Sequence, residues 1–189
     1  MRGPTVAERF RYRPGADGGS VVGRLEPEEI VILERVLADV EELLAPEGGE
    51  EQDPLVELTG YSPAAETPQD GALRALLPDA AEDDESAGEF RRLTEYSLRT
   101  DKIADLRAAR VLIAAESLRL SLEEAETLAR AFNSVAIVLA ERLAIRSDED
   151  AAAVSEIEDP QDDDEFMAVL YNFVGWIRGG LSTALIDAL

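Results

Sequence analysis

The stretch SLEEAETLARAFNSVAIVLAERL, residues 121–143, decides the fold class of this chain. It opens with the form S-x-x-E, a capping box in which the Ser121 hydroxyl and the Glu124 carboxylate each accept a hydrogen bond from a backbone N–H group of the first helical turn. Apolar residues then recur at spacings of three and four: Ala125, Leu128, Ala129, Phe132, Val135, Ala136, Leu139 and Leu143. The stretch therefore predicts an amphipathic helix that packs on a core.

Three other segments have the same helical period: residues 27–45, 89–116 and 166–185. The first begins with Pro27, which suits a first helical turn, and it ends before Pro46. Ala and Leu supply much of the 46% hydrophobic fraction, and both residues lose little on entering a helix. We expect a mainly α fold, a helical bundle of about four main helices.

A β-hairpin is predicted ahead of the helices, at residues 9–25. The run Arg-Phe-Arg-Tyr-Arg at 9–13 alternates in the manner of a strand, and a turn-rich segment follows it. Residues 46–88 and 147–165 are rich in acidic side chains and are predicted to be linkers, the first containing one or two short helices. The length of the chain fits a single domain, 1–189.

The net charge of −23 is distributed unevenly. Residues 1–24 carry a charge of +3, while the rest of the chain carries −26. Affinity for nucleic acid depends on Lys and Arg neutralising phosphates, so the overall charge argues against direct DNA binding. The hairpin arginines Arg9, Arg11 and Arg13 share one face of the alternating run. They either pair with the protein's own carboxylates or form a contact surface for a partner.

The chain contains no histidine and no cysteine. A thiolate nucleophile and a disulfide are therefore excluded, and a di-iron site of the Glu-x-x-His kind cannot be assembled. The sequence contains neither the phosphate-binding motif G-x-x-x-x-G-K-[ST] nor the dinucleotide-binding motif G-x-G-x-x-G between a strand and a helix. We expect no catalytic residue, no cofactor and no metal. Acidic runs at 148–150 and 162–165 leave an oxygen-liganded Ca²⁺ or Mg²⁺ site as an alternative, although acids are also expected at the start of a helix.

The terminal segment 166–186 is about long enough to span a bilayer. Arg178 lies near its middle, where a charge costs about 2.5 kcal/mol or more, and several glycines reduce its apolar character. We therefore expect no membrane span. The N-terminus lacks the apolar run of a signal peptide, so the expected location is the cytoplasm.

Four polar positions on the predicted helices are candidate partner contacts. Arg91, Arg92 and Lys102 lie on the long middle helix, and Lys102 is the only lysine in the chain. Asn133 lies inside the capped helix, where asparagine is a poor helix former. Each of these side chains either bonds to a neighbouring part of the protein or contacts a partner.

Three runs of the sequence, residues 89–102, 131–145 and 171–176, resemble one actinobacterial family. The hairpin and the segment 25–29 are similar to the opening of that family. The family is known as a domain of unknown function and includes the oxidative-stress regulator AosR. The resemblance implies a small helical protein, often encoded beside the ClpS proteolysis adaptor and genes for sulfur-carrier-dependent cysteine synthesis. It implies a role in transcriptional control of redox balance and does not imply an enzyme.

Two departures from the family limit what the resemblance implies. The regulator's redox sensing depends on a cysteine pair, and this chain has no cysteine. Ala136 stands where a family arginine is expected. Thiol sensing is therefore not carried over.

The sequence thus predicts a non-enzymatic regulatory or adaptor protein that acts through protein–protein contacts. The resemblance implies a partner in the transcription or proteolysis machinery. Two alternatives remain open: a carboxylate-based metal-binding protein or enzyme, and a structural homo-oligomer that pairs through the terminal helix.

Overall fold

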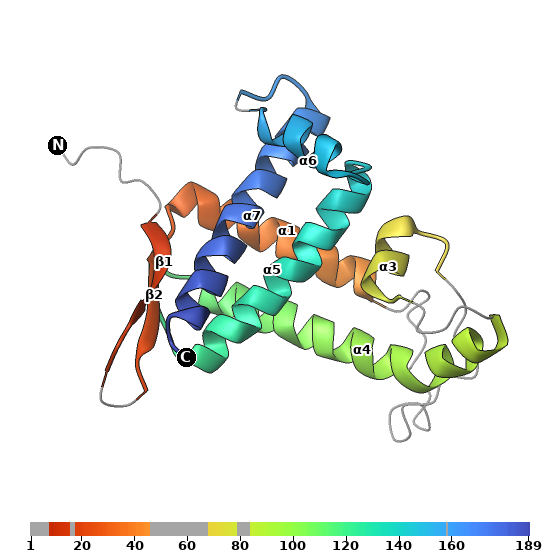
Figure 1. Ribbon diagram of the computed structural model, residues 1–189, viewed down its shortest axis with the longest axis horizontal. Coiled ribbons are helices and arrows are strands. Elements are labelled where there is room, and N and C mark those ends of the chain that lie inside the picture. The colour runs from red at the N-terminus through yellow and green to blue at the C-terminus, as the bar shows by residue number, and fades with distance from the viewer. Residues whose placement is uncertain (1–7, 16–17, 46–67, 79–83, 158) are drawn as a thin grey trace.

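The computed structural model describes residues 8–15, 18–45, 68–78, 84–157 and 159–189, with the backbone alone at residue 8 and at 84–93. The described elements, in chain order, are β1 (Glu8–Arg13), β2 (Ser20–Arg24), α1 (Pro27–Leu44), α3 (Gly71–Leu76), α4 (Asp84–Leu112), β3 (Ser117–Leu120), α5 (Leu122–Arg142), α6 (Asp148–Ser155) and α7 (Asp163–Ile186). The predicted mainly helical fold with an N-terminal hairpin is confirmed, and α1, α4, α5 and α7 are its long helices (Figure 1).

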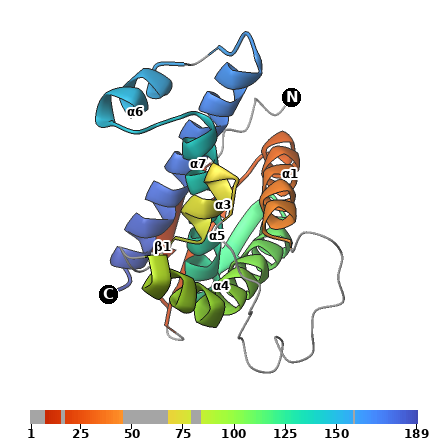
Figure 2. The same cartoon turned by 90° about the vertical axis from the view of Figure 1, so that its right-hand side faces the viewer.

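The capped helix predicted at residues 121–143 is α5, and it lies at the centre of the fold. The Ser121 hydroxyl accepts a hydrogen bond from the Glu124 N–H at 3.1 Å, and the Glu124 carboxylate accepts one from the Ser121 N–H at 2.7 Å. α5 contacts α1, α3, α4 and α7, and Figure 2 shows α1 and α7 on either side of it. Because α5 has neighbours on several sides, Ala131 and Val138 are buried although they lie off the predicted apolar stripe.

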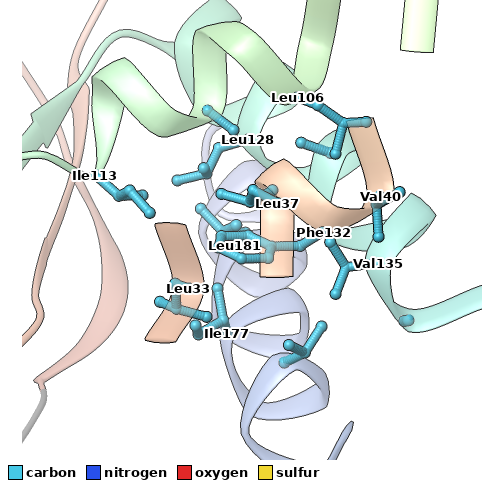
Figure 3. Packing of buried hydrophobic residues seen from close by; sticks show 14 of the residues in the cluster. Leu33, Leu37, Val40, Leu106, Ile113, Leu128, Phe132, Val135, Ile177 and Leu181 are labelled. Carbon is cyan, nitrogen blue, oxygen red and sulfur yellow. The ribbon is translucent and has the colours of Figure 1, made fainter. Parts of the chain in front are cut away.

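The hydrophobic core lies where the four long helices meet. Figure 3 shows side chains from all four helices pointing into this space. The following labelled side chains belong to the buried cluster: Leu33, Leu37, Val40, Leu106, Ile113, Leu128, Phe132, Val135, Ile177 and Leu181. Burying a side chain of this size contributes about 1.5–3 kcal/mol, so this cluster is the main source of stability for the arrangement of the helices.

A third strand, β3, was not predicted from the sequence. It pairs antiparallel with β2, and the sheet order is β1-β2-β3. Its four residues, Ser-Leu-Arg-Leu, lie between two long helices, and so short a run shows little of the strand period by itself. The backbone N–H and C=O groups of β3 find their hydrogen-bond partners in β2.

The predicted acidic linker at 147–165 is partly wrong, because it contains the helix α6. The Ser147 hydroxyl accepts a hydrogen bond from the Asp150 N–H at 3.2 Å, and the Asp150 carboxylate accepts one from the Ser147 N–H at 2.9 Å. The acidic run therefore caps a helix, as the positive end of the helix dipole favours. The side chain of Asn172 on α7 donates to the Val154 carbonyl at 2.9 Å and ties α6 to α7.

The predicted linker at 46–88 also differs from the structure at its end. α4 starts at Asp84, inside the predicted linker, whereas the helix was predicted to start at Glu89. α3 is a short helix of the kind expected in this region. Residues 46–67 and 79–83 of the predicted linker lie outside the described residues. In the described part of the chain, no helix combines the length and the apolar character needed to cross a membrane.

Candidate functional site

The side of the sheet that faces away from the core carries arginine side chains. In the pairing register Tyr12, Val21 and Leu120 form one cross-strand row, and Val21 and Leu120 are buried. The next row, Arg11, Val22 and Arg119, therefore points to the opposite side of the sheet.

The outer sheet face, as we name it, carries four arginines. They are Arg11, Arg13, Arg24 and Arg119. Two of them belong to the predicted hairpin arginines. Arg119 comes from the unpredicted strand β3.

The third hairpin arginine, Arg9, lies beside α7. The pairing register between β1 and β2 shifts between Glu8 and Arg11, as at a β-bulge. A Cβ atom at Gly180 would lie 3.3 Å from both the Arg9 Cγ and the Phe10 backbone nitrogen. β1 thus packs directly on the backbone of α7, and Figure 1 shows the hairpin beside the C-terminal half of that helix.

The arginines of the outer sheet face differ in how their charge is balanced. Arg24 forms ion pairs with Glu116 at 2.8 Å and with Glu26 at 3.4 Å. Arg119 instead donates to the neutral Ser20 hydroxyl at 3.1 Å. Within the described residues, neither Arg13 nor Arg119 forms an ion pair with a carboxylate. Guanidinium groups remain exposed on this face although the chain as a whole has a charge of −23.

A polar groove, with a volume of about 780 Å³, lies between α4, α5 and α7. Two of the predicted contact residues, Lys102 and Asn133, lie in its wall. The complete lining consists of Leu98, Asp101, Lys102, Ala104, Asp105, Ala129, Arg130, Asn133, Ser134, Arg178 and Ser182. The groove thus collects three cationic side chains from three different helices.

Two hydrogen-bonded contacts form the wall of the groove. The Nε and Nη2 atoms of Arg130 donate to the two carboxylate oxygens of Asp105, both at 2.9 Å, and these bonds raise the pKa of Arg130. The Nη2 atom of Arg178 donates to the Oδ1 atom of Asn133 at 2.7 Å. Asn133 therefore connects α5 to α7, and this bond is one of the two roles expected for its side chain.

Lys102 is the half-buried cation of the groove. Burial lowers its pKa from the ordinary value of lysine, and the negative charge of Asp105 partly opposes that change. Among the described residues no side chain forms an ion pair with Lys102. The only lysine in the chain therefore holds a partly desolvated charge.

A second hollow, of about 580 Å³, lies between α1 and α4 and differs in its charges. The Nε atom of Arg107 donates to Glu41 at 2.6 Å, and the Nη1 atom of Arg110 donates to the other oxygen of Glu41 at 3.2 Å. Both arginines in its lining are paired, so this hollow offers no unpaired cation to a ligand.

The remaining predicted contact residues and the acidic runs considered as metal sites lie outside these two surfaces. Arg91 and Arg92 lie on α4, and their side chains are outside the described residues. Asp162 caps α7 by accepting from the Glu165 N–H at 2.9 Å, just as Ser147 caps α6 by accepting from the Asp150 N–H. No three acidic side chains in the described part of the chain converge as metal ligands would.

Sequence reasoning missed four residues of these surfaces: Arg24, Arg119, Arg130 and Arg178. A signal existed for Arg178, since it is the only charge in the apolar terminal stretch. Arg119 had a weak signal in the alternation of Ser-Leu-Arg-Leu. Arg130 had none beyond its place on the polar side of α5.

These features define a small, mainly helical protein with two arginine-bearing surfaces on an acidic body. The chain matches the family model described as a domain of unknown function (DUF2017) over residues 7–185, and it belongs to that family. The predicted membership in an uncharacterised domain family is confirmed. No curated protein and no solved structure matches the chain.

Proposed function

We propose that this protein is a non-enzymatic regulatory or adaptor protein that binds an acidic surface of a protein partner through its outer sheet face. The exposed guanidinium groups of Arg13 and Arg119, unpaired with carboxylates among the described residues, carry the proposal. Guanidinium is the cation best suited to paired hydrogen bonds with a carboxylate.

The support beneath these arginines favours binding. Phe10 is 2% exposed and lies against Gly23 and Gly180, so β1 is held between β2 and α7. A rigid strand presents its arginines with little loss of backbone entropy on binding. Single exposed ion pairs contribute only about 0–1 kcal/mol, so the face acts through several arginines together and through faster encounter with an acidic surface.

The cellular setting of this proposal comes from the resemblance to the family of AosR. On that basis the protein acts in the cytoplasm of an actinobacterium, in transcriptional or stress control, with a partner in the transcription or proteolysis machinery. Any such control is independent of thiols, because the chain has no cysteine. The acidic body disfavours direct contact with DNA.

The experiment compares two charge reversals of equal size in the full chain. Arg13→Glu with Arg119→Glu changes the outer sheet face, while Arg35→Glu with Arg74→Glu changes exposed arginines on α1 and α3. Tagged proteins are used to capture partners from the native host at moderate salt, and captured proteins are identified by mass spectrometry. We expect a transcription or proteolysis component that the first variant loses and the second retains. Equal capture by both variants, or capture of no such component, contradicts the proposal.

A second candidate function, a structural homo-oligomer, is favoured by the exposed aromatic side of α7. Phe166 is 49% exposed and Trp176 is 36% exposed, and the ring of Phe173 stacks on Trp176 with centroids 6.0 Å apart. Large apolar side chains on one helix are a common basis for helix pairing between subunits. Light scattering on the unmodified chain and on Trp176→Gln tests it, and a monomer in both cases removes this candidate.

A further inference from the structure

The groove between α4, α5 and α7 contains more hydrogen-bond donors than its own residues use. Lys102 has three N–H donors and forms no hydrogen bond to the described residues. Arg178 donates once, through Nη2, to Asn133. This bond occupies the amide oxygen of Asn133, so its NH₂ group still has donors to offer, as does the rest of the Arg178 guanidinium.

The charges of the groove are also incompletely balanced. Arg130 and Asp105 neutralise each other through two hydrogen bonds, and Asp101 is exposed at the edge. Lys102 and Arg178 have no ion pair within the described part of the chain. A half-buried ammonium group whose burial Asp105 offsets only in part is costly, and an anion placed next to it would recover part of that cost.

We propose that this groove binds a small organic anion, whose oxyanion group lies between Lys102 and Arg178 and accepts a hydrogen bond from the Asn133 amide. The volume of about 780 Å³ is within the range of about 300–1,000 Å³ that is usual for small-molecule sites. Leu98, Ala104 and Ala129 provide an apolar part of the lining for the carbon skeleton of the ligand.

The shared chemistry of the ligand is an oxyanion, either a carboxylate or a phosphate. Both accept hydrogen bonds from ammonium, guanidinium and amide groups. The site is separate from the outer sheet face, because its residues come from α4, α5 and α7 and none belongs to the sheet. Ligand binding here can therefore be tested without any protein partner.

The experiment uses the fact that Lys102 is the only lysine. Reductive methylation with ¹³C-formaldehyde labels Lys102 and the α-amino group of the full chain, and the Lys102 signal is identified by its absence from a Lys102→Arg variant. The labelled protein is titrated with citrate, with inorganic phosphate and with chloride. The ionic strength is held at about 0.15 M, where the Debye length of about 8 Å screens distant acidic side chains.

We expect citrate, phosphate or both to shift the Lys102 signal in a saturable way that chloride does not reproduce. An anion at ten times its dissociation constant that binds only the protonated amine raises the measured pKa of Lys102 by about 1, by linkage. A response to citrate alone identifies a carboxylate ligand, and a response to phosphate alone identifies a phosphorylated one. Calorimetry on the unmethylated protein provides a second readout with the same anions.

Two variants serve as controls. Arg178→Gln removes one cation and keeps an amide near Asn133, so we expect anion affinity to fall by about tenfold, the effect of losing a charged hydrogen bond, with the fold intact by circular dichroism. Lys102→Arg combined with Arg35→Lys moves the single lysine to an exposed position of α1. Absence of both a saturable shift and binding heat would overturn the proposal. So would unchanged affinity in Arg178→Gln, or an equal shift for the lysine at position 35.

Discussion

The same chemical change, glycine to alanine, is expected to have opposite effects at Gly175 and at Gly23. At Gly175, inside α7, an added Cβ atom has no neighbour within 4 Å beyond the local helix backbone. Alanine loses less backbone entropy than glycine in a helix, so Gly175→Ala should stabilise the fold by about 0.5–1 kcal/mol.

At Gly23, inside β2, the added Cβ atom would lie 2.7 Å from Cδ1 and 2.9 Å from Cε1 of the Phe10 ring. Phe10 is 2% exposed, and its backbone nitrogen and Cβ atom lie against α7 at Gly180, so a shift of β1 that relieved the ring would meet α7. Overpacking of this kind costs about 1–3 kcal/mol. The displaced ring would also shift β1, which carries Arg9, Arg11 and Arg13.

The assay is thermal unfolding, followed by circular dichroism and by calorimetry, of both variants and the unmodified protein. In a chain of this size a change of 1 kcal/mol moves Tm by about 2–4 °C. We expect Gly175→Ala to raise Tm by about 1–4 °C and Gly23→Ala to lower it by about 2–12 °C. A Gly23→Ala variant as stable as the unmodified protein would refute the packing argument for Phe10, and a destabilised Gly175→Ala would refute the open surroundings of that position.

Three further predictions concern the core and the helix caps. Phe132 is fully buried, so Phe132→Ala should cost about 3–5 kcal/mol in urea unfolding, and a loss below about 1 kcal/mol would contradict its place in the core. Ser147→Ala should speed amide hydrogen exchange in the first turn of α6 with little change in global Tm, because α6 has no buried residue; a large fall in global Tm would contradict this. The Asp70 carboxyl accepts hydrogen bonds from the Leu73 N–H and from Arg142 on α5, and these bonds hold its pKa below the usual range. The charged form therefore stabilises the fold at pH values above the unfolded pKa. This contribution is lost as the pH falls through the lower folded pKa. Asp70→Asn should therefore lower the urea midpoint at pH 7, and the difference from the unmodified protein should shrink in acid; a difference that does not change with pH would contradict this.

The outer sheet face and the groove between α4, α5 and α7 could each be predicted from the sequence only in part. Alternation in the run at 9–13 was enough to predict that Phe10 and the arginines lie on opposite faces of the strand. Local alternation does not place Arg119 beside these arginines, because the pairing of β2 with β3 joins segments separated by α1 and α4. Whether an arginine is paired also depends on the position of distant acids, as the bond of Arg24 to Glu116 shows.

By itself, the sequence determined the four long helices, the hairpin and the Ser121 cap, because these depend on neighbours within a few residues. The apolar period of residues 121–143 and the Ser121 cap are of this kind, and so is the alternation that makes β1 a strand. Only the tertiary structure decided that Lys102, Asn133 and Arg178 share one groove and that Arg119 joins the hairpin arginines. These groupings are set by the packing of helices and strands far apart in the chain, and the local periodicity of each element contains no information about which element lies opposite it.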